Sequence, residues 1–292
     1  MAATSLVGKG RAAISLILDE GTFEENRIGG TVLDAGLGPG AVVGSGRLNG
    51  RVVTVIANDA KLRNPRFPVV YAGIIGLEEA YKMAEAVYAS IAADDGLPPE
   101  KKRPLVLIVD SPGNGPGKIE EIFGMNKATG AYQLALIEAR QKGHPVVAMI
   151  IGRAISGAFL CHGLQADRIL TLSKEYGTMI HVMPLSSIAR ITKRDIETLE
   201  TLSKTNPVFA SGADYFYKLG GVEEIIEDSA NMREAISRHI DEVYAFNSAG
   251  RREENGPRGR GALGAKRGGR KKRQQVLALM EQEFALIEDE YL

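Results

Sequence analysis

The fold is decided by PLVLIVD-SPGNGPG (residues 104–117) and PVVAMIIG-RAISGA (residues 145–158), two stretches of similar design. Each begins with a continuous apolar run of strand length and continues into a turn of small residues. A run without polar alternation is typical of a strand that is buried on both faces, as in a parallel layer between helices. Between the two runs, AYQLALIEARQKG (131–143) has helical spacing and is closed by a glycine. The sequence therefore predicts an α/β fold with parallel strands and right-handed crossovers.

Segments on either side extend this unit. Runs rich in β-branched and aliphatic residues predict strands at 51–59 and 167–172, and apolar residues at helical spacing predict a helix at 76–92. RAAISLILDEGTFEE (11–25) predicts a short N-terminal helix that Gly21 ends. From residue 185 onward the pattern predicts mostly helix.

The C-terminal part has an uneven charge distribution. The net charge of the chain is zero, yet residues 251–273 hold ten Lys or Arg against two Glu. We expect a domain at 1–248, a basic, glycine-rich, mobile segment at 249–273 and an amphipathic helix at 274–292. The basic segment is either a solvated tether for that helix or an attractor for an anionic partner. It contains no aromatic residue for base stacking, so we expect no nucleic-acid partner.

Composition narrows the class of protein further. Cys161 is the single cysteine, which excludes an internal disulfide framework and fits a reducing compartment. No apolar window has the length of a membrane span or a signal peptide, so we expect a cytoplasmic protein without a membrane partner. No cluster of His, Cys and carboxylate residues has metal-ligand spacing, so we expect no metal. Cys161 and His162 diverge on a helix and cannot form a nucleophile–base pair, and the serine hydrolase motif GxSxG is absent.

The turns after the two apolar runs are the candidate site. Ligands of α/β sheets gather at the carboxyl ends of the strands, and free N–H groups at a helix N-terminus favour negative charge. Two such turns side by side would hold an oxyanion, as an enolate or a tetrahedral intermediate requires. Glycines after buried strands also occur as plain tight connections, so the residues alone leave the function open.

Four segments in order resemble the biotin-dependent acyl-CoA carboxyltransferases. They are the N-terminal signature at 11–25, VVTVIANDAKLRNPRFPVVYAGIIGLEEAYKMAEAV (52–87), DSPGNGPG (110–117) and GRAISGAF (152–159). The matches span roughly residues 11–160, more than half of the chain. The resemblance implies the crotonase-like ββα superhelix, and the length of the chain leaves room for one such domain. The sequence departs from the family pattern at Ser156, where the family has a first glycine, and at Asn114, where it has an aromatic residue or alanine.

Within this family, the segments 111–140 and 146–170 are similar to the gamma subunits of malonate decarboxylases. The similarity implies loss of a carboxyl group from a malonyl thioester on an acyl carrier protein, through a thioester enolate. Its carrier arm would be a phosphoribosyl-dephospho-CoA group, and this chain itself would bind no cofactor. A homologous beta subunit would be an obligate partner that contributes a second oxyanion site, and an acyl-carrier transferase subunit is a further expected partner.

The resemblance also assigns roles to individual residues. Backbone N–H groups of the two turns would stabilise the oxyanion; they belong to Gly113, Asn114, Ser156, Gly157 and Ala158. Substrate-binding positions would be Pro112, Gly115, Gly152 and Arg153, where Arg153 is equally expected as an ordinary ion-pair residue. Two alternatives stay open: a carboxyltransferase subunit that passes the carboxyl group to biotin, and a non-catalytic scaffold that completes a partner's pocket.

Overall fold

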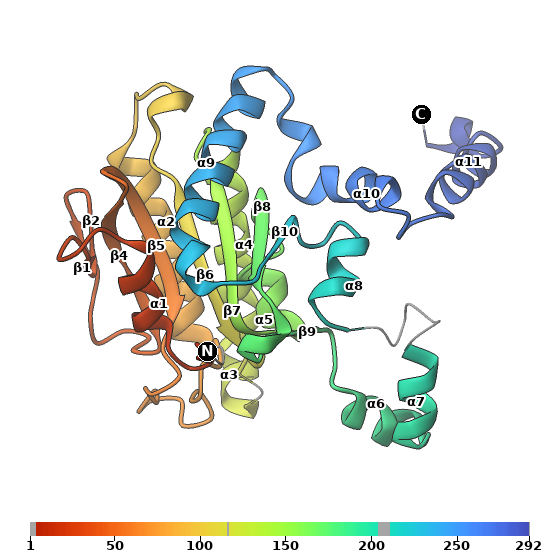
Figure 1. The fold of residues 1–292 in the computed structure, drawn as a ribbon, viewed down its shortest axis with the longest axis horizontal. Helices are drawn as coiled ribbons and strands as arrows, with labels where there is room; N and C mark the ends of the chain where they lie inside the picture. The colour runs from red at the N-terminus through yellow and green to blue at the C-terminus, as the bar shows by residue number, and fades with distance from the viewer. Residues whose placement is uncertain (1–3, 116, 204–210, 292) are drawn as a thin grey trace.

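A computed structural model describes residues 4–115, 117–203 and 211–291 of the chain. In this part of the chain the central element is an eight-stranded sheet with the order β1-β4-β5-β6-β7-β8-β10, in which β9 also pairs with β7 (Figure 1). The strands from β5 to β10 along this order run parallel, whereas β1, β4 and β5 are antiparallel neighbours. The strands of this sheet are β1 (Glu24–Glu25), β4 (Ala41–Leu48), β5 (Arg51–Asn58), β6 (Leu105–Ser111), β7 (Val146–Ile155), β8 (Arg168–Leu172), β9 (Met179–His181) and β10 (Glu224–Ile226).

The predicted parallel layer is confirmed, because the segments expected as strands become β5, β6, β7 and β8. Every residue of β6 is buried, as its uninterrupted apolar run predicts. The sequence analysis missed the antiparallel hairpin of β4 and β5, because the glycines of β4 hide its strand character. A separate small ribbon pairs β2 (Arg27–Ile28) with β3 (Thr31–Val32).

Helices cover both faces of the sheet and so bury two hydrophobic clusters. One face packs against α2 and α4, and the other packs against α1 and α9 (Figure 1). The described helices are α1 (Gly10–Ile17), α2 (Leu77–Ala93), α3 (Lys118–Phe123), α4 (Met125–Gln141), α5 (Ser156–Cys161), α6 (Leu185–Thr192), α7 (Ile196–Ser203), α8 (Ala213–Lys218), α9 (Met232–Ser248), α10 (Gly256–Lys266) and α11 (Arg273–Phe284). None of these helices combines the length and the apolar character needed to cross a membrane.

The N-terminal helix ends earlier than predicted. Helix α1 stops at Ile17, and Gly21 lies beyond it in a turn with φ +70°. The carboxylate of Asp19 accepts the N–H groups of Asn49 and Gly50, which fixes the chain after the helix to the β4–β5 hairpin. The tertiary contacts of Asp19, not the glycine, therefore set the end of this helix.

The segment 249–273 is not the mobile stretch that its composition suggested. It contains a short 3₁₀ turn and α10, and its arginines donate to backbone carbonyls of the main domain. Arg260 is buried and reaches the carbonyl oxygens of Leu164 and Ala166. Arg267 reaches the carbonyl oxygens of Tyr217, Val222 and Glu223 and also stacks on the Tyr217 ring. The positive charges at these two positions serve as anchors and are not free for an anionic partner.

The glycines of this segment have a packing role. A side chain at Gly264 would collide with the carbonyl of Leu219, and one at Gly269 would collide with the carbonyl of Lys218. Helix α10 thus approaches the end of α8 backbone to backbone, and only glycine permits this distance. Helix α11 follows, with no buried residue, and extends away from the main body (Figure 1).

The anchoring role of Arg260 leads to a stability prediction. Replacing Arg260 with Ala removes two charge-assisted hydrogen bonds and leaves two carbonyls without a donor, so the free energy of unfolding is expected to fall by about 2–3 kcal/mol. Arg258→Ala is the matched control, because Arg258 lies on the same helix, is exposed and pairs with the exposed Glu253. Its effect should stay within about 0.5 kcal/mol. Urea unfolding of the two variants tests this, and equal losses would contradict the anchor.

Candidate functional site

The structure brings the two predicted turns together at the carboxyl ends of β6 and β7. Ser111 is in register with Ala154, so the chain leaves both strands at the same level. A cavity of about 470 Å³ opens between the turns. Its lining contains Ile74, Pro112, Gly113, Asn114, Gly115, Glu121, Met125, Ser156 and Gly157. Six of the nine predicted site residues therefore share one cavity, and Gly152, Arg153 and Ala158 stand behind it.

The first turn is held as a short extension of the sheet. Ile75 donates its N–H to the Gly113 carbonyl at 3.1 Å and accepts the Gly115 N–H at 3.0 Å. The Gly113 N–H is directed at the Ser111 hydroxyl at 3.3 Å. Successive N–H groups of an extended chain point to opposite sides, so the N–H of Asn114 faces away from Ile75, on the side of β7. Of the two donors expected in this turn, the Asn114 N–H is the one without a hydrogen-bond acceptor among the described residues.

The second turn carries backbone strain. Ser156 adopts φ +54°, a left-handed conformation, at the point where β7 ends and α5 begins. A residue other than glycine in such a conformation costs on the order of 1–3 kcal/mol and persists where the surrounding structure enforces it. The first N–H groups of a helix have no acceptor within the helix, and the first two residues of α5, Ser156 and Gly157, line the cavity. This strained position is the one where the family pattern has glycine.

The two turns touch through Asn114 and Gly157. A side chain at Gly157 would collide with Asn114 Oδ1, so the absence of a Cβ is what allows this approach. The Asn114 amide in turn donates towards the Ile75 carbonyl at 3.4 Å and the Cys161 sulfur at 3.9 Å. Asn114 therefore contacts both the segment of Ile75 and helix α5.

Arg153 and Gly152 support the turns from behind. The Arg153 guanidinium binds Asp110 through Nε at 2.8 Å and through Nη2 at 3.2 Å, and the Arg153 N–H reaches the same carboxylate. A Cβ at Gly152 would stand 2.5 Å from Asp110 Oδ1. The structure thus shows Arg153 in the ordinary ion pair that the sequence left open, and it ties the end of β7 to the end of β6.

Cys161 and His162 are both buried in the core. Burial raises the pKa of the Cys161 thiol to about 12. The His162 ring donates to the Ile108 carbonyl and accepts from the Tyr132 hydroxyl, both at 2.9 Å, and burial lowers its pKa to about 4. His162 is therefore neutral at physiological pH and links α5 to α4 and β6.

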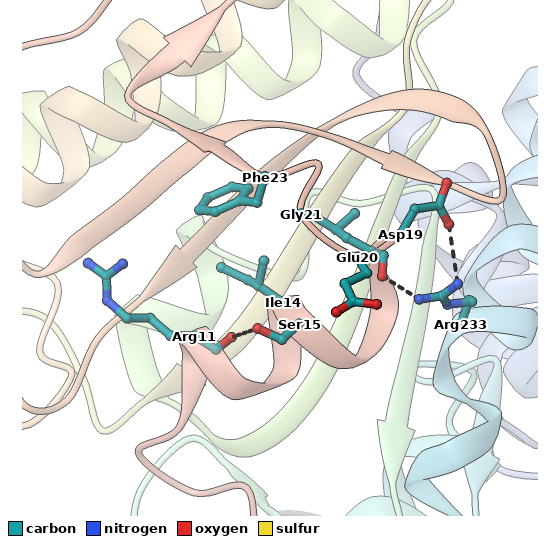
Figure 2. A pocket seen from close by; sticks show the side chains of 9 residues that line it. Arg11, Ile14, Ser15, Asp19, Glu20, Gly21, Phe23 and Arg233 are labelled. Carbon is teal, nitrogen blue, oxygen red and sulfur yellow. Dashed lines mark hydrogen bonds and ion pairs between the residues drawn. The ribbon is translucent and has the colours of Figure 1, made fainter.

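A second, larger cavity of about 700 Å³ lies between α1, the loop after it and α9 (Figure 2). Three of its four charged lining residues are paired, Arg11 with Glu25 and Asp59, and Arg233 with Asp19, whereas Glu20 is exposed. Figure 2 shows the Arg233 guanidinium bridging the Asp19 carboxylate and the chain just before it. These ion pairs give the charged residues of the N-terminal signature a structural role. We therefore place the functional site at the two turns and not at this cavity.

Sequence reasoning missed Ile74, Glu121 and Met125 as lining residues. Ile74 and its neighbour Ile75 belong to the second of the four resembling segments, which gave a signal for that region but not for its contact with Asn114. Glu121 and Met125 follow the first turn in α3 and α4, and nothing in their spacing distinguishes them from surface residues.

Comparison with known proteins decides the family. The sequence profile of the malonate decarboxylase gamma subunit matches residues 71–284. The chain belongs to the malonate decarboxylase gamma subunit family. A curated relative, malonyl-S-ACP:biotin-protein carboxyltransferase MADD of Malonomonas rubra, is 60% identical over 288 residues, which cover 98% of this chain and 99% of the relative.

Solved structures agree with the assignment to the malonate decarboxylase gamma subunit family. The structure of a Pseudomonas malonate decarboxylase hetero-tetramer in complex with coenzyme A has a chain that matches with a TM-score of 0.76 at 28% identity, over 94% of this chain and 98% of that one. A chain of the Pseudomonas MdcD-MdcE hetero-dimer matches with a TM-score of 0.65 at 30% identity, over 77% and 92%. The transcarboxylase 12S structure matches with a TM-score of 0.62 at 25% identity, and this chain covers 41% of it. The crotonase-like carboxyltransferase fold is thereby confirmed.

Proposed function

We propose that this gamma subunit stabilises the enolate of an acyl thioester that forms when a malonyl group on an acyl carrier protein loses its carboxyl group. The C–C bond to the carboxyl group breaks, the electron pair moves into the thioester enolate, and a proton is then added to carbon. One observation carries the proposal. The side of the first turn that presents the Asn114 N–H and the start of α5 line the same cavity.

The chemistry of these groups supports this role. N–H donors fixed in advance at the position where negative charge develops are usually the largest single contribution to such reactions. Here the Asp110–Arg153 ion pair fixes one strand end to the other, and the contact of Gly157 with Asn114 fixes the turns to each other. We infer that Asn114, Ser156, Gly157 and Ala158 supply one oxyanion site, and that Gly113 acts through its carbonyl bond to Ile75.

A partner subunit is part of this proposal. The known malonate decarboxylase chains occur in a hetero-dimer and a hetero-tetramer, and the transcarboxylase chain is more than twice as long as the part matched here. Beside the cavity, α3 turns three apolar side chains to solvent: Ile119, Ile122 and Phe123 are 57%, 71% and 69% exposed. An apolar rim of this kind marks an interface. We propose that a homologous beta subunit covers it and contributes the second oxyanion site and most of the thioester pocket.

The carrier arm, the loading subunit and the location of the protein are further parts of this proposal. The acyl carrier protein would present its thioester on a phosphoribosyl-dephospho-CoA arm, and an acyl-carrier transferase subunit would load it. The chain itself would hold no cofactor. A cytoplasmic location is part of this proposal and is supported by the unpaired, buried thiol of Cys161.

A second candidate concerns the fate of the carboxyl group. The relative that shares 60% identity is named for transfer to a biotin protein, whereas the two malonate decarboxylase chains described above share 28% and 30%. In this version the carboxyl group bonds to a biotin nitrogen, and the proton that this nitrogen gives up ends on the enolate carbon. The same oxyanion site serves both reactions, so the geometry of this chain fits either acceptor.

Avidin distinguishes the two candidates. The complex would be purified with its native partners, and release of carbon dioxide from malonyl-loaded carrier protein would be measured with and without avidin. If biotin is the acceptor, avidin should abolish release and mass spectrometry should find a biotinylated protein in the complex. Full activity in avidin would contradict the biotin version and leave direct decarboxylation.

A further inference from the structure

Glu120 is buried in a helix whose apolar residues are exposed. Its exposed fraction is 0%, and it is the only buried residue of α3, while Ile119, Ile122 and Phe123 of the same helix face solvent. A carboxyl group is costly to bury. A helix that buries its glutamate and exposes its apolar residues therefore needs a specific reason.

The carboxyl group of Glu120 lies between the two segments that form the Ile75–Asn114 bridge. Its Oε1 accepts the Leu77 N–H at 3.3 Å, which caps the N-terminus of α2 directly after Ile75. A Cβ at Gly76 would stand 2.6 Å from Oε1, and a Cβ at Gly115 would collide with Oε2. Both segments therefore lack a side chain at the place where this carboxyl group is inserted.

The surroundings favour the neutral form of Glu120. Burial raises the pKa of Glu120, and the charges of Glu79, Glu121 and Glu78 raise it further, against the lowering effect of the Leu77 N–H. Burial also raises the pKa of Glu79, whose Oε2 would lie 2.8 Å from a Cβ at Gly76. Among the described residues, neither Oε2 has a hydrogen-bond partner. These surroundings therefore shift the pKa of Glu120 upward, towards the neutral carboxyl group, whose shape an amide reproduces.

We propose that Glu120 is a positioning residue that holds the Ile75–Asn114 bridge in place and thereby sets the direction of the Asn114 N–H. The inference rests on the proposed oxyanion role of Asn114. Glu120 does not touch the cavity: it contacts the back of Gly115, whose N–H bonds to Ile75 on one side of Asn114. Its removal would let the turn sink towards the space it leaves, and a displacement of about 1 Å costs up to about 100-fold in rate.

The test uses the assembled complex with Glu120→Ala, Glu120→Gln and the matched control Glu223→Ala. Glu223 also uses its carboxylate to accept a backbone N–H, that of Ile169, but at β8 and away from the turns. For Glu120→Ala we expect a fall in kcat of about 10- to 100-fold with KM for the malonyl-carrier protein changed less than about threefold. Glu120→Gln keeps the shape of the neutral group and should recover most of kcat. Glu223→Ala should lower the melting temperature without this change in kcat.

Hydrogen exchange separates this inference from the proposed function. Glu120→Ala should speed exchange of the Ile75 and Gly115 amides, and Glu120→Gln should restore slow exchange, whatever the reaction is. Unchanged exchange in Glu120→Ala would overturn the positioning role and leave the proposed function intact. Faster exchange with unchanged kcat would leave Glu120 as a support of the bridge but overturn the oxyanion role of Asn114, and with it the effect on catalysis proposed here. A loss in Glu120→Gln as large as in Glu120→Ala would also overturn the inference, because the neutral shape would then be insufficient.

Discussion

Turnover of the assembled complex is expected to fall by about 100- to 1,000-fold in Gly157→Val, the range found when one oxyanion donor is removed. A valine side chain at this position collides with Asn114 Oδ1, so the Asn114 side chain must leave its place between the two turns, and the added bulk crowds the start of α5. The N–H groups of the two turns then no longer point to the same oxyanion position, although the reacting groups of the substrate are unchanged. The measurement is carbon dioxide release from malonyl-loaded carrier protein under saturating substrate.

Ser156→Ala is the matched control, because it removes a hydroxyl one residue away and adds no bulk. Alanine accepts the φ of +54° at a cost similar to that of serine, so the variant should keep most of the turnover. Ser156→Gly would relieve the strain and should be at least as stable as the natural protein. An equally severe loss in Ser156→Ala, with folding and assembly intact, would point to a role of the hydroxyl in proton transfer and against the backbone site.

The isolated chain is expected to release no measurable carbon dioxide from a malonyl thioester. In the proposed shared site this chain supplies one face, and the cavity between the turns opens beside the exposed apolar residues of α3. Without a partner, water reaches the position where the enolate would form, and no second subunit encloses the thioester. The assay compares this chain alone, the beta subunit alone and the mixture.

Two outcomes of that assay are informative. Activity that appears only in the mixture supports a shared site, and the Gly157→Val mixture then tests which part belongs to this chain. Comparable rates with and without the partner would contradict a shared site. If Gly157→Val does not change the rate of the mixture, this chain acts only as a scaffold.

Local sequence patterns predicted the parallel strands well, because burial on both faces leaves an apolar run that few other structures explain. They also predicted the two turns, since small residues after such runs sit at the carboxyl ends of the strands. Six lining residues followed from that reasoning. The assignment of the N–H donors did not, because it depends on which carbonyl each N–H faces, and Ile75 lies about forty residues from Asn114 in the chain.

The basic segment shows a different limit. Glycine and arginine in a row predict a mobile chain when only composition is considered, since both are common in unstructured segments. Gly264 and Gly269 instead permit close backbone packing, and Arg260 and Arg267 satisfy carbonyls of distant segments. No single-sequence pattern distinguishes a glycine that is free to move from one that is pressed against a carbonyl.

The position of Cys161 has a consequence for the chemistry of thioesters. Its sulfur is buried behind the proposed thioester site, 3.9 Å from the side-chain amide of the lining residue Asn114. A thiolate there would compete for the acyl group and form an unproductive acyl-enzyme, because thiolates exchange readily with thioesters. Burial raises the pKa of this thiol to about 12, so the thiol stays protonated at neutral pH. Burial therefore protects the carrier-bound intermediate from capture by the protein that processes it.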